Sequence, residues 1–426
     1  MSFTKRSITC KEAGESCLVA THSSGLKVYI SAKESFAANY AVFGTQYGSV
    51  DTEFGLGDQP MIKTPEGIAH FLEHKLFEGE DGDAFEKYAK TGASANAYTS
   101  FDRTCYLFGC SDRFYENLDI LLSFVTSPYF TPQTVQKEQG IIGQEIKMYE
   151  DVPDWRVLFN LFKVMYHNHP VKVEIAGTVA SIAKITDKTL YDCYRTFYNP
   201  SNMYICLAGN FDTGKVLEII DKKFPQAHDD SRIVRSDFSE PESIVKNYTE
   251  LEMAVSMPLF VIGIKDKPAG STAITAKKAA AELFLEILAG KISPLYNKLL
   301  EEGLINNRFG TEHFYGHSYS ALLFEGESKN PAAVRDAILK GIADIVQNGV
   351  EQSLFCDAQK KLYGCTVRAY NDPEEAVGEF IDCSIDGVEP YSDLLALKTI
   401  TADDVTAFAR SLNLENAALS VILPKI

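Results

Sequence analysis

One order of elements occurs twice in this 426-residue chain, and the two copies are 215 positions apart. Ile185 and Thr186 precede a helical pattern, an asparagine and an apolar strand, and the same order begins again at Ile400 and Thr401. Thr is a favoured N-cap residue, so each copy predicts a capped helix followed by a strand. The repeat predicts an internal duplication, and the alternative is a chance similarity of two helix–strand pairs.

The chain is too long for one ordinary hydrophobic core, which agrees with two domains. The polar stretch 229–243, which ends in Ser-Glu-Pro-Glu-Ser, is the predicted junction. We therefore expect an N-terminal domain over 1–235 that carries the chemistry, and a C-terminal domain of the same fold over 236–426. The predicted fold class is α+β, with two homologous sandwich-like domains that each contain a mostly antiparallel sheet covered by helices.

Turn residues and hydrophobic periodicity define the elements of the first domain. The expected strands are a hairpin over 18–31, a β-rich run over 38–50, a pair over 95–99 and 104–108, and 203–208. The expected helices cover 83–90, 113–125, a segment from Thr131 onward, 149–165 and 187–197.

A further predicted helix carries His70, Glu73 and His74 in the order His-x-x-Glu-His. The two imidazoles leave the same helix face one turn apart, as two ligands of a single metal ion must, and Glu73 stands within reach of a water there. This order is the inverzincin signature, and the alternative is a pair of core histidines satisfied by neighbouring groups. Thr64 is predicted to cap the helix, with Pro65 at its first position.

Catalytic zinc usually has three protein ligands, so a third must come from elsewhere in the chain. Glu138 and Glu145 are seven residues apart on the helix that begins near Thr131, and they therefore share one face. One of them would complete the metal site, and the other would hydrogen-bond to a ligand ring or to the attacking water. A solvated helix face is the alternative for either glutamate.

The same helix contains Gly140 and Gly143, which cost roughly 1 kcal/mol each relative to Ala. A close approach to the histidine-bearing helix would compensate for that cost. Ile141, Ile142 and Ile146 are expected to form its buried flank.

Two other histidine pairs fit a metal site less well. His167 and His169 have strand-like spacing, no carboxylate in register, and the composition of a polar turn before a proline. His313 and His317 have helical spacing, but Gly316 interrupts them and no glutamate lies between.

Composition excludes several classes of function. A hydrophobic content of 45% and a charged content of 23% indicate a globular protein, and a net charge of −17 argues against nucleic-acid and anionic-membrane binding. The nine cysteines never form Cys-x-x-Cys, a pattern typical of reduced buried thiols. The N-terminal residues lack the apolar core of a signal peptide, so we expect a cytoplasmic protein.

The motif and its surroundings resemble the zinc metallopeptidases of the pitrilysin, insulin-degrading enzyme and mitochondrial processing peptidase group. The resemblance rests on the run from Pro65 to Gly79 (PEGIAHFLEHKLFEG), on 92–99 (GASANAYT), on Glu138 and Glu145, and on 198–203 (YNPSNM). It covers the first half of the chain in order and the second half more loosely. The closest likeness is to short bacterial members, each a duplicated half-clamp of two domains.

The resemblance implies one Zn²⁺ per chain, bound by His70, His74 and Glu145. It gives Glu73 the role of general base and makes Glu138 the supporting carboxylate of the catalytic group. It also implies that a substrate peptide adds as an extra strand to the edge formed by Asn96, Ala97, Tyr98 and Thr99.

Enzymes of this group enclose peptides in chambers made from two half-clamps, so the resemblance implies a second subunit, either an identical copy or a related chain. The opposite half-clamp contributes an Arg and a Tyr to substrate binding. This sequence has Leu322 or Leu323 at the expected Arg position, while Arg308 and Tyr315 lie earlier, in a predicted loop. The chain is therefore expected to receive those two groups from a partner.

The sequence thus predicts a zinc metalloendopeptidase that hydrolyses small unfolded peptides. Two alternatives come from other classes: a non-catalytic scaffold subunit of a peptidase-like heterodimer, and a module that binds a peptide strand without cutting it. An intact metal motif argues against a scaffold, since a scaffold has no need of it.

Overall fold

The computed structural model describes residues 2–224 and 232–425, and the chain forms two compact units. Unit 1 consists of 1–146, 174–236 and 367–391, and unit 2 of 147–173, 237–366 and 392–426. The units are therefore not the contiguous segments 1–235 and 236–426. The difference arises because each half of the sequence contributes one helix to the sheet of the other half, as described below for each unit.

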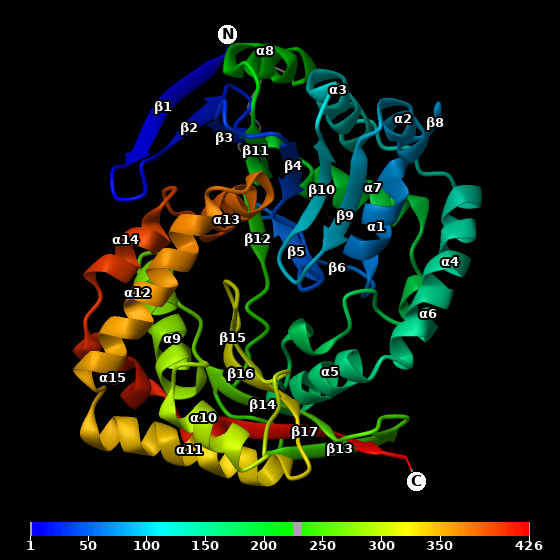
Figure 1. Ribbon diagram of the computed structural model, residues 1–426. Coiled ribbons are helices and arrows are strands. Elements are labelled where there is room, and N and C mark those ends of the chain that lie inside the picture. Colours follow the sequence, from blue (N-terminus) through cyan, green and yellow to red (C-terminus); the bar gives the residue numbers. More distant parts are fainter. Residues whose placement is uncertain (1, 225–231, 426) are drawn as a thin grey trace. The chain divides into compact units, whose positions relative to one another are not determined.

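Unit 1 is built on a seven-stranded sheet with the order β1-β2-β3-β11-β4-β10-β9 (Figure 1). Every neighbouring pair is antiparallel except β11 with β3. The pairing of β2 with β3 and of β9 with β10 confirms the two expected hairpins. The strands are β1 (Phe3–Cys10), β2 (Glu15–His22), β3 (Lys27–Ala32), β4 (Asn39–Thr45), β9 (Ser94–Thr99), β10 (Thr104–Cys110) and β11 (Met203–Gly209).

Helices cover both faces of this sheet. The metal-motif helix α1 and helix α3 pack on one face, and α13 packs on the other, against β11 and β4. The helices of unit 1 are α1 (Ile68–Phe77), α2 (Ala84–Thr91), α3 (Phe114–Val125), most of α4 (Pro132–Glu150), α6 (Val179–Ile182), α7 (Asp187–Phe197), α8 (Thr213–Lys223) and α13 (Pro373–Asp386). Short strands β5 (Glu53–Leu56), β6 (Ile62–Lys63), β7 (Glu78–Gly79), β8 (Gly82–Asp83) and β12 (Ile233–Arg235) lie outside the main sheet.

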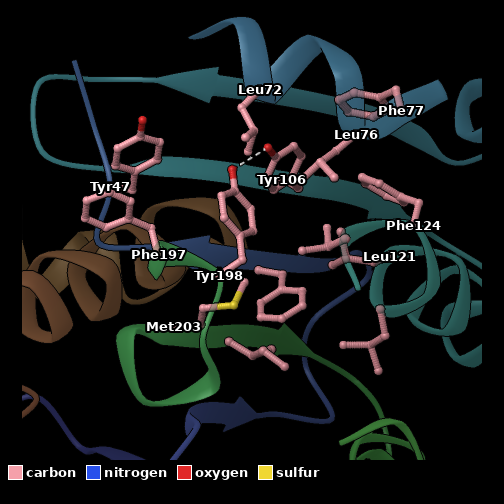
Figure 2. Close-up of a cluster of buried hydrophobic side chains, with 14 of the residues drawn as sticks. Tyr47, Leu72, Leu76, Phe77, Tyr106, Leu121, Phe124, Phe197, Tyr198 and Met203 are labelled. Atoms are coloured by element: carbon pink, nitrogen blue, oxygen red, sulfur yellow. Dashed lines mark hydrogen bonds between the residues drawn. The ribbon is translucent and has the colours of Figure 1, made fainter. Parts of the chain in front are cut away.

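The buried side of α1 is fixed by a dense apolar cluster (Figure 2). Leu72, Leu76 and Phe77 point from the helix toward the sheet and α3, and each is less than 10% exposed. Burial of each such side chain contributes about 1.5–3 kcal/mol. Beneath them the hydroxyls of Tyr106 and Tyr198 form a 2.8 Å hydrogen bond, so the polar ends of these buried rings are satisfied. The helix face opposite Leu72 and Leu76 carries His70 and His74, and Phe77 shares that face and lines the pocket beside His74.

Unit 2 contains a five-stranded sheet with the order β13-β17-β14-β16-β15 (Figure 1). Its helices α9, α11 and α15 share a core with one sheet face, while α5 packs on β17 and β14. The strands are β13 (Tyr248–Met253), β14 (Leu259–Asp266), β15 (Gly310–Tyr315), β16 (Ser320–Glu327) and β17 (Ala417–Pro424). The helices are α5 (Pro153–Met165), α9 (Ile274–Ala289), α10 (Pro294–Glu301), α11 (Pro331–Asn348), most of α12 (Gln352–Ala369), α14 (Ser392–Thr399) and α15 (Ala402–Ser411).

The two units confirm the predicted duplication and fold class. The order β3-β11-β4-β10-β9 in unit 1 matches β13-β17-β14-β16-β15 in unit 2, with the parallel pair in the same place. Thr186 and Thr401 each form the capping box of the helix that precedes the last strand of the main sheet in their repeat. Each repeat also supplies one helix to the other unit, since α5 belongs to unit 2 and α13 to unit 1.

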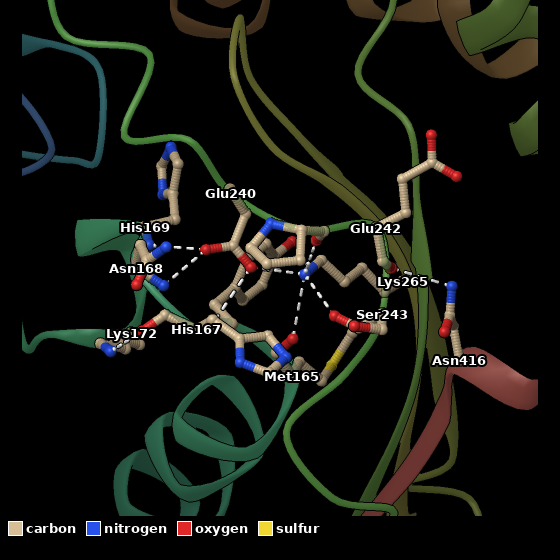
Figure 3. A network of polar contacts seen from close by, with 12 residues as sticks. Met165, His167, Asn168, His169, Lys172, Glu240, Glu242, Ser243, Lys265 and Asn416 are labelled. Atoms are coloured by element: carbon tan, nitrogen blue, oxygen red, sulfur yellow. Dashed lines mark hydrogen bonds and ion pairs between the residues drawn. The ribbon is translucent and has the colours of Figure 1, made fainter.

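The expected junction at 229–243 is anchored to the fold over part of its length. Residues 229–231 lie outside the described residues, and 233–235 pair with β5 as β12. Further along, Glu240 accepts hydrogen bonds from the backbone N–H groups of His167, Asn168 and His169, and it also contacts Lys265 (Figure 3). The part of this stretch around Glu240 is therefore held within unit 2 by polar contacts.

Candidate metal centre

Three side chains of unit 1 converge as the sequence predicts. Nε2 of His70 lies 3.6 Å from Oε1 of Glu145, and Nε2 of His74 lies 3.5 Å from Oε2. One possible ligand atom from each residue lies within 4.8 Å of the others, and no other such trio occurs in the described part of the chain. Helical spacing brings the two rings together on α1, and α4 supplies the carboxylate.

These separations and the chemistry of the donors fit a zinc ion. A tetrahedral zinc with bonds near 2.0–2.2 Å holds its ligand atoms about 3.4 Å apart, and the two ring nitrogens lie 3.6 and 3.5 Å from the two carboxylate oxygens of Glu145. Burial, together with the neighbouring His74, lowers the pKa of His70 to about 3, which keeps its imidazole in the neutral form that binds metals. Nδ1 of His70 is buried without a hydrogen-bond partner among the described residues.

Glu138 orients the second histidine. Its Oε1 accepts a 3.1 Å hydrogen bond from Nδ1 of His74, which directs the lone pair of Nε2 toward Glu145. Burial lowers the pKa of His74, but this hydrogen bond and the charges of Glu73, Glu145 and Glu138 outweigh it, so the pKa is raised. Glu138 contacts the ring, and it is a positioning residue for His74.

Glu73 lies beside the ligand group with a buried carboxylate. Its Oε2 accepts a 2.6 Å hydrogen bond from the hydroxyl of Thr99, which is the last residue of β9. Burial raises the pKa of Glu73, opposed by this hydrogen bond and by His74. The hydroxyl contact is a feature that sequence reasoning missed, because Thr99 was singled out only as part of the edge strand.

Two glycines position the start of α1. Gly67 has φ 86°, and a Cβ there would lie 2.3 Å from the carbonyl oxygen of Ala176. A Cβ at Gly177 would lie 2.6 Å from the carbonyl oxygen of Glu66, which also accepts a 2.9 Å hydrogen bond from the Ser181 hydroxyl. The backbone crossing requires glycine at both positions.

The predicted start of the metal helix is wrong. Thr64 does not cap α1; its hydroxyl donates to the carbonyl of Thr52, and Pro65 precedes the helix. The helix begins after Gly67, which provides no side-chain cap. The contact that fixes this start comes from residues more than 100 positions away, where local cap rules do not apply.

Two expectations for α4 are also wrong. A Cβ at Gly140 or Gly143 would meet nothing within 4 Å, so these glycines do not allow a close helix approach. Ile142 and Ile146 are buried, but Ile141 is 47% exposed. Ile141 instead lines a pocket of about 740 Å³ beside the ligand group, together with Glu73, His74 and Glu138.

The remaining predicted site residues lie on β9, at the border of the sheet. Among the described residues β9 pairs with β10 alone, so its other edge is open. Asn96 and Ala97 line the pocket beside the metal group, and Thr99 contacts Glu73. Strand and ligand group are thus adjacent in unit 1.

The other histidine pairs take no part in a metal group among the described residues. His169 is buried in the polar turn that was expected, where it caps a short 3₁₀ helix. His313 lies in strand β15, so it and His317 do not have helical spacing. Tyr315 ends the same strand, which corrects its placement in a loop, and Arg308 forms ion pairs within unit 2, to Asp154 and Glu327.

Comparison with known proteins agrees with this geometry. Residues 62–179 match the insulinase family, peptidase family M16, and 184–362 match the inactive domain of the same family. An uncharacterized zinc protease, YmfH of Bacillus subtilis, is 39% identical over 389 residues, which cover 90% of each chain. The chain therefore belongs to the M16 peptidases.

Solved structures extend the comparison. A putative M16-like peptidase from Alicyclobacillus acidocaldarius has a TM-score of 0.90 and 31% identity, over 100% of this chain and 99% of that one. Pitrilysin has the same fold, with a TM-score of 0.78 at 15% identity, and this chain covers 47% of its length. No helix among the described residues is long and apolar enough to cross a membrane.

Proposed function

We propose that this chain is a zinc-dependent metalloendopeptidase that hydrolyses small unfolded peptides, with one zinc ion held by His70, His74 and Glu145. The observation that carries the proposal is the meeting of three ligand atoms with a buried, unligated carboxylate at their side. The zinc-protease relative supports the same class of activity.

In this proposal Glu73 is the general base. When bound, zinc would polarise the substrate carbonyl and acidify a water molecule. Glu73 accepts a proton from that water as it attacks the carbonyl carbon, and returns it to the leaving amine as the peptide C–N bond breaks. Burial raises its pKa toward the working pH, and the Thr99 hydroxyl holds its carboxylate in one orientation.

The peptide is proposed to bind along the open edge of β9, at Asn96, Ala97, Tyr98 and Thr99. Backbone hydrogen bonds to an edge strand give affinity with little dependence on sequence. Thr99 connects the two functions, because its backbone belongs to the peptide-binding edge while its hydroxyl holds the base. Glu138 positions His74 throughout the reaction.

A second half-clamp, either an identical copy or a related chain, is proposed to close the chamber. The chain spans about half of pitrilysin, whose fold it shares. Arg308 is engaged by Asp154 and Glu327, which supports a partner as the source of the substrate-binding Arg and Tyr. Cleavage is therefore assayed with the chain alone and with the partner subunit that co-purifies with it.

The substitution Glu73→Gln tests the mechanism. We expect the variant to retain zinc, while peptide cleavage falls by about 10²–10⁴-fold, the usual contribution of a general base. A quenched fluorescent peptide reports cleavage, and metal analysis after dialysis reports zinc. Glu86→Gln, at an exposed position on α2 outside the site, is the control. Full activity of Glu73→Gln would exclude this mechanism, and zinc binding without cleavage in the native complex would favour the scaffold alternative.

A further inference from the structure

A second pocket reaches the edge strand from the face of the sheet opposite the metal group. It has a volume of about 510 Å³, and its lining includes Tyr40, Asn96, Tyr98, Asp372 and Glu374. The last two residues come from the N-terminal end of α13, the helix that covers this face of unit 1. Nothing in the proposed chemistry uses this pocket.

The alternation of β9 connects the two pockets. Successive residues of a strand point to opposite faces, so Thr99, which contacts Glu73, lies on the α1 face. Tyr98 lies on the other face, where it lines the second pocket. A peptide that extends the sheet at β9 follows the same alternation. Every second side chain would therefore face the metal group, and the side chains between them would face the second pocket.

The charge of the second pocket is negative. Its lining contains two carboxylates and no Lys, Arg or His. Asp372 is used in the fold, because it accepts hydrogen bonds from the backbone N–H groups of Glu374 and Glu375 at the start of α13. Glu374 accepts a 3.2 Å hydrogen bond from the hydroxyl of Tyr40 and has no ion pair with a described cation.

The side chain of Glu374 takes no part in capping α13, and its one hydrogen-bond donor among the described residues is the hydroxyl of Tyr40. A carboxylate held by a neutral hydroxyl keeps its full charge, and it can accept further hydrogen bonds from a cationic group. The rings of Tyr40 and Tyr98 give apolar walls along which the methylenes of a long side chain can pack.

We propose that this pocket is a specificity subsite for a Lys or Arg side chain of the substrate, with Glu374 as the residue that recognises its charge. The proposal rests on the proposed peptidase function and adds a substrate class to it. The basic residue would occupy positions of one parity only, next in sequence to the residues that face the metal group.

Cleavage of a set of fluorogenic peptides tests this subsite. Each peptide is neutral except for one Lys, which is moved along the sequence, and a Gln peptide serves as reference. We expect kcat/KM for Lys over Gln to be about two- to fivefold at alternate positions, the range of an exposed ion pair, and to be near one at the positions between. The preference should decrease as salt is added.

The variants Glu374→Gln and Glu374→Lys should remove and reverse the preference at those positions. Glu375→Lys is the matched control, because Glu375 is an exposed carboxylate on the same helix turn but does not line the pocket. It should leave the alternating pattern as it is in the native chain. A preference that survives Glu374→Lys, or that is equal at adjacent positions, would overturn the subsite.

A binding measurement separates this proposal from the proposed function. The anisotropy of the same labelled peptides is measured with the Glu73→Gln variant, alone and combined with Glu374→Lys. An alternating Lys preference that depends on Glu374 supports the subsite even if no native peptide is cut, an outcome that would contradict only the peptidase proposal. Cleavage without any Glu374-dependent pattern would contradict only the subsite.

Discussion

Two buried groups of charged side chains differ in how completely their hydrogen bonds are made. In unit 2, Nζ of Lys265 donates to three backbone carbonyls and to Glu240, which also accepts three backbone N–H groups (Figure 3). In unit 1, the ring nitrogens of His70 and His74 face Glu145 at 3.5–3.6 Å, and Nδ1 of His70 has no partner among the described residues.

The difference separates a structural role from a ligand-binding one. A buried polar network with every group satisfied stabilises one conformation, whereas incomplete networks are costly and persist where they serve a ligand. The Lys265 network joins β14, the turn after α5 and the segment before β13, all within unit 2. The histidine group brings together ligand atoms of two helices, α1 and α4, at separations longer than an ordinary hydrogen bond. Substitutions in the histidine group should therefore reduce zinc binding and cleavage but not stability, whereas substitutions in the Lys265 network should reduce stability.

The largest effect is expected for Glu145→Gln and His70→Ala. Loss of a ligand should weaken zinc binding by more than the roughly 10–100-fold typical of an outer-shell partner, and cleavage should fall with it. Glu138→Ala removes such a partner and should itself cost about 10–100-fold. Metal analysis after dialysis and peptide cleavage give the order of the three variants.

The same variants should not unfold the protein. Among the described residues the side chain of Glu145 contacts only His70 and His74, at 3.5–3.6 Å, so the free energy of unfolding of the metal-free Glu145→Gln variant should change by less than about 1 kcal/mol. Urea unfolding after chelation measures it. A large loss of stability relative to the metal-free native chain would mean that this carboxylate is structural, and the contrast between the two groups would disappear.

The second prediction concerns the Lys265 network, in which Glu240→Gln removes the carboxylate that pairs with the lysine. It leaves the 5% exposed Lys265 side chain without its counter-charge and should lower the free energy of unfolding by about 3–5 kcal/mol. Glu242→Gln is the matched control, because Glu242 pairs with Lys267 where both side chains are more than 70% exposed, and its loss should cost less than about 1 kcal/mol. Urea unfolding at pH 7 compares them, and equal effects would contradict the prediction.

The pH dependence of this prediction has a definite sign. Burial raises the pKa of Glu240, but Lys265 and the backbone N–H groups outweigh it and lower the pKa to about 2. An unfolded glutamate has a pKa near 4.3, so the stabilisation is present above that pH and is lost as the pH falls toward 2. The stability difference between the native chain and Glu240→Gln should therefore close over this range. Burial also lowers the pKa of His169 to about 4. Because an unfolded histidine takes up its proton near pH 6.5, this residue should lower the free energy of unfolding as the pH falls from about 6.5 to 4, before Glu240 is protonated.

Much of the candidate site could be predicted because its geometry is local. His70 and His74 meet through helical spacing alone, and Glu138 and Glu145 share a face for the same reason. The duplication was visible at Thr186 and Thr401, where a cap and a strand recur, and the matching strand orders confirm it.

The parts that could not be predicted depend on contacts between distant residues. The crossing of Gly67 and Gly177 joins segments 110 positions apart, and no cap rule or periodicity indicates it. The assignment of α5 to unit 2 and of α13 to unit 1 is equally non-local. The apolar face of each helix predicts that it covers a sheet, but it does not indicate which of the two sheets. Ile141 looked like core by composition, but its direction on α4 points it into a pocket.

The two repeats also keep the same anchor on corresponding helices. Gln139 of α4 donates its amide to the carbonyls of Ile182 and Ile185, and Gln359 of α12 donates to those of Leu397 and Ile400. At the same offset of 220 positions, Glu138 and Glu145 correspond to an alanine and a cysteine. The contact that holds the helix is thus present twice, whereas the carboxylates occur only in unit 1.

The smallest effect is expected for Gly140→Ala and Gly143→Ala on α4. A Cβ at either position meets nothing within 4 Å, so the gain in helix propensity, about 1 kcal/mol each, should raise the free energy of unfolding. Gly364→Ala should do the same on α12, where the Cβ position is also open. Gly341→Ala is the control, because its Cβ would lie 2.9 Å from Leu288 and should stabilise less.

Urea unfolding and peptide cleavage are both measured for these variants, because the two results together distinguish three explanations for the glycines. Lower stability of the Gly140→Ala chain would mean that α4 is packed more closely than its open surroundings indicate. Higher stability with native cleavage would mean that the glycine is simply tolerated. Higher stability with reduced cleavage would mean that the flexibility of α4, rather than its packing, matters for the reaction, because neither Gly140 nor Gly143 lines the pocket beside the metal group.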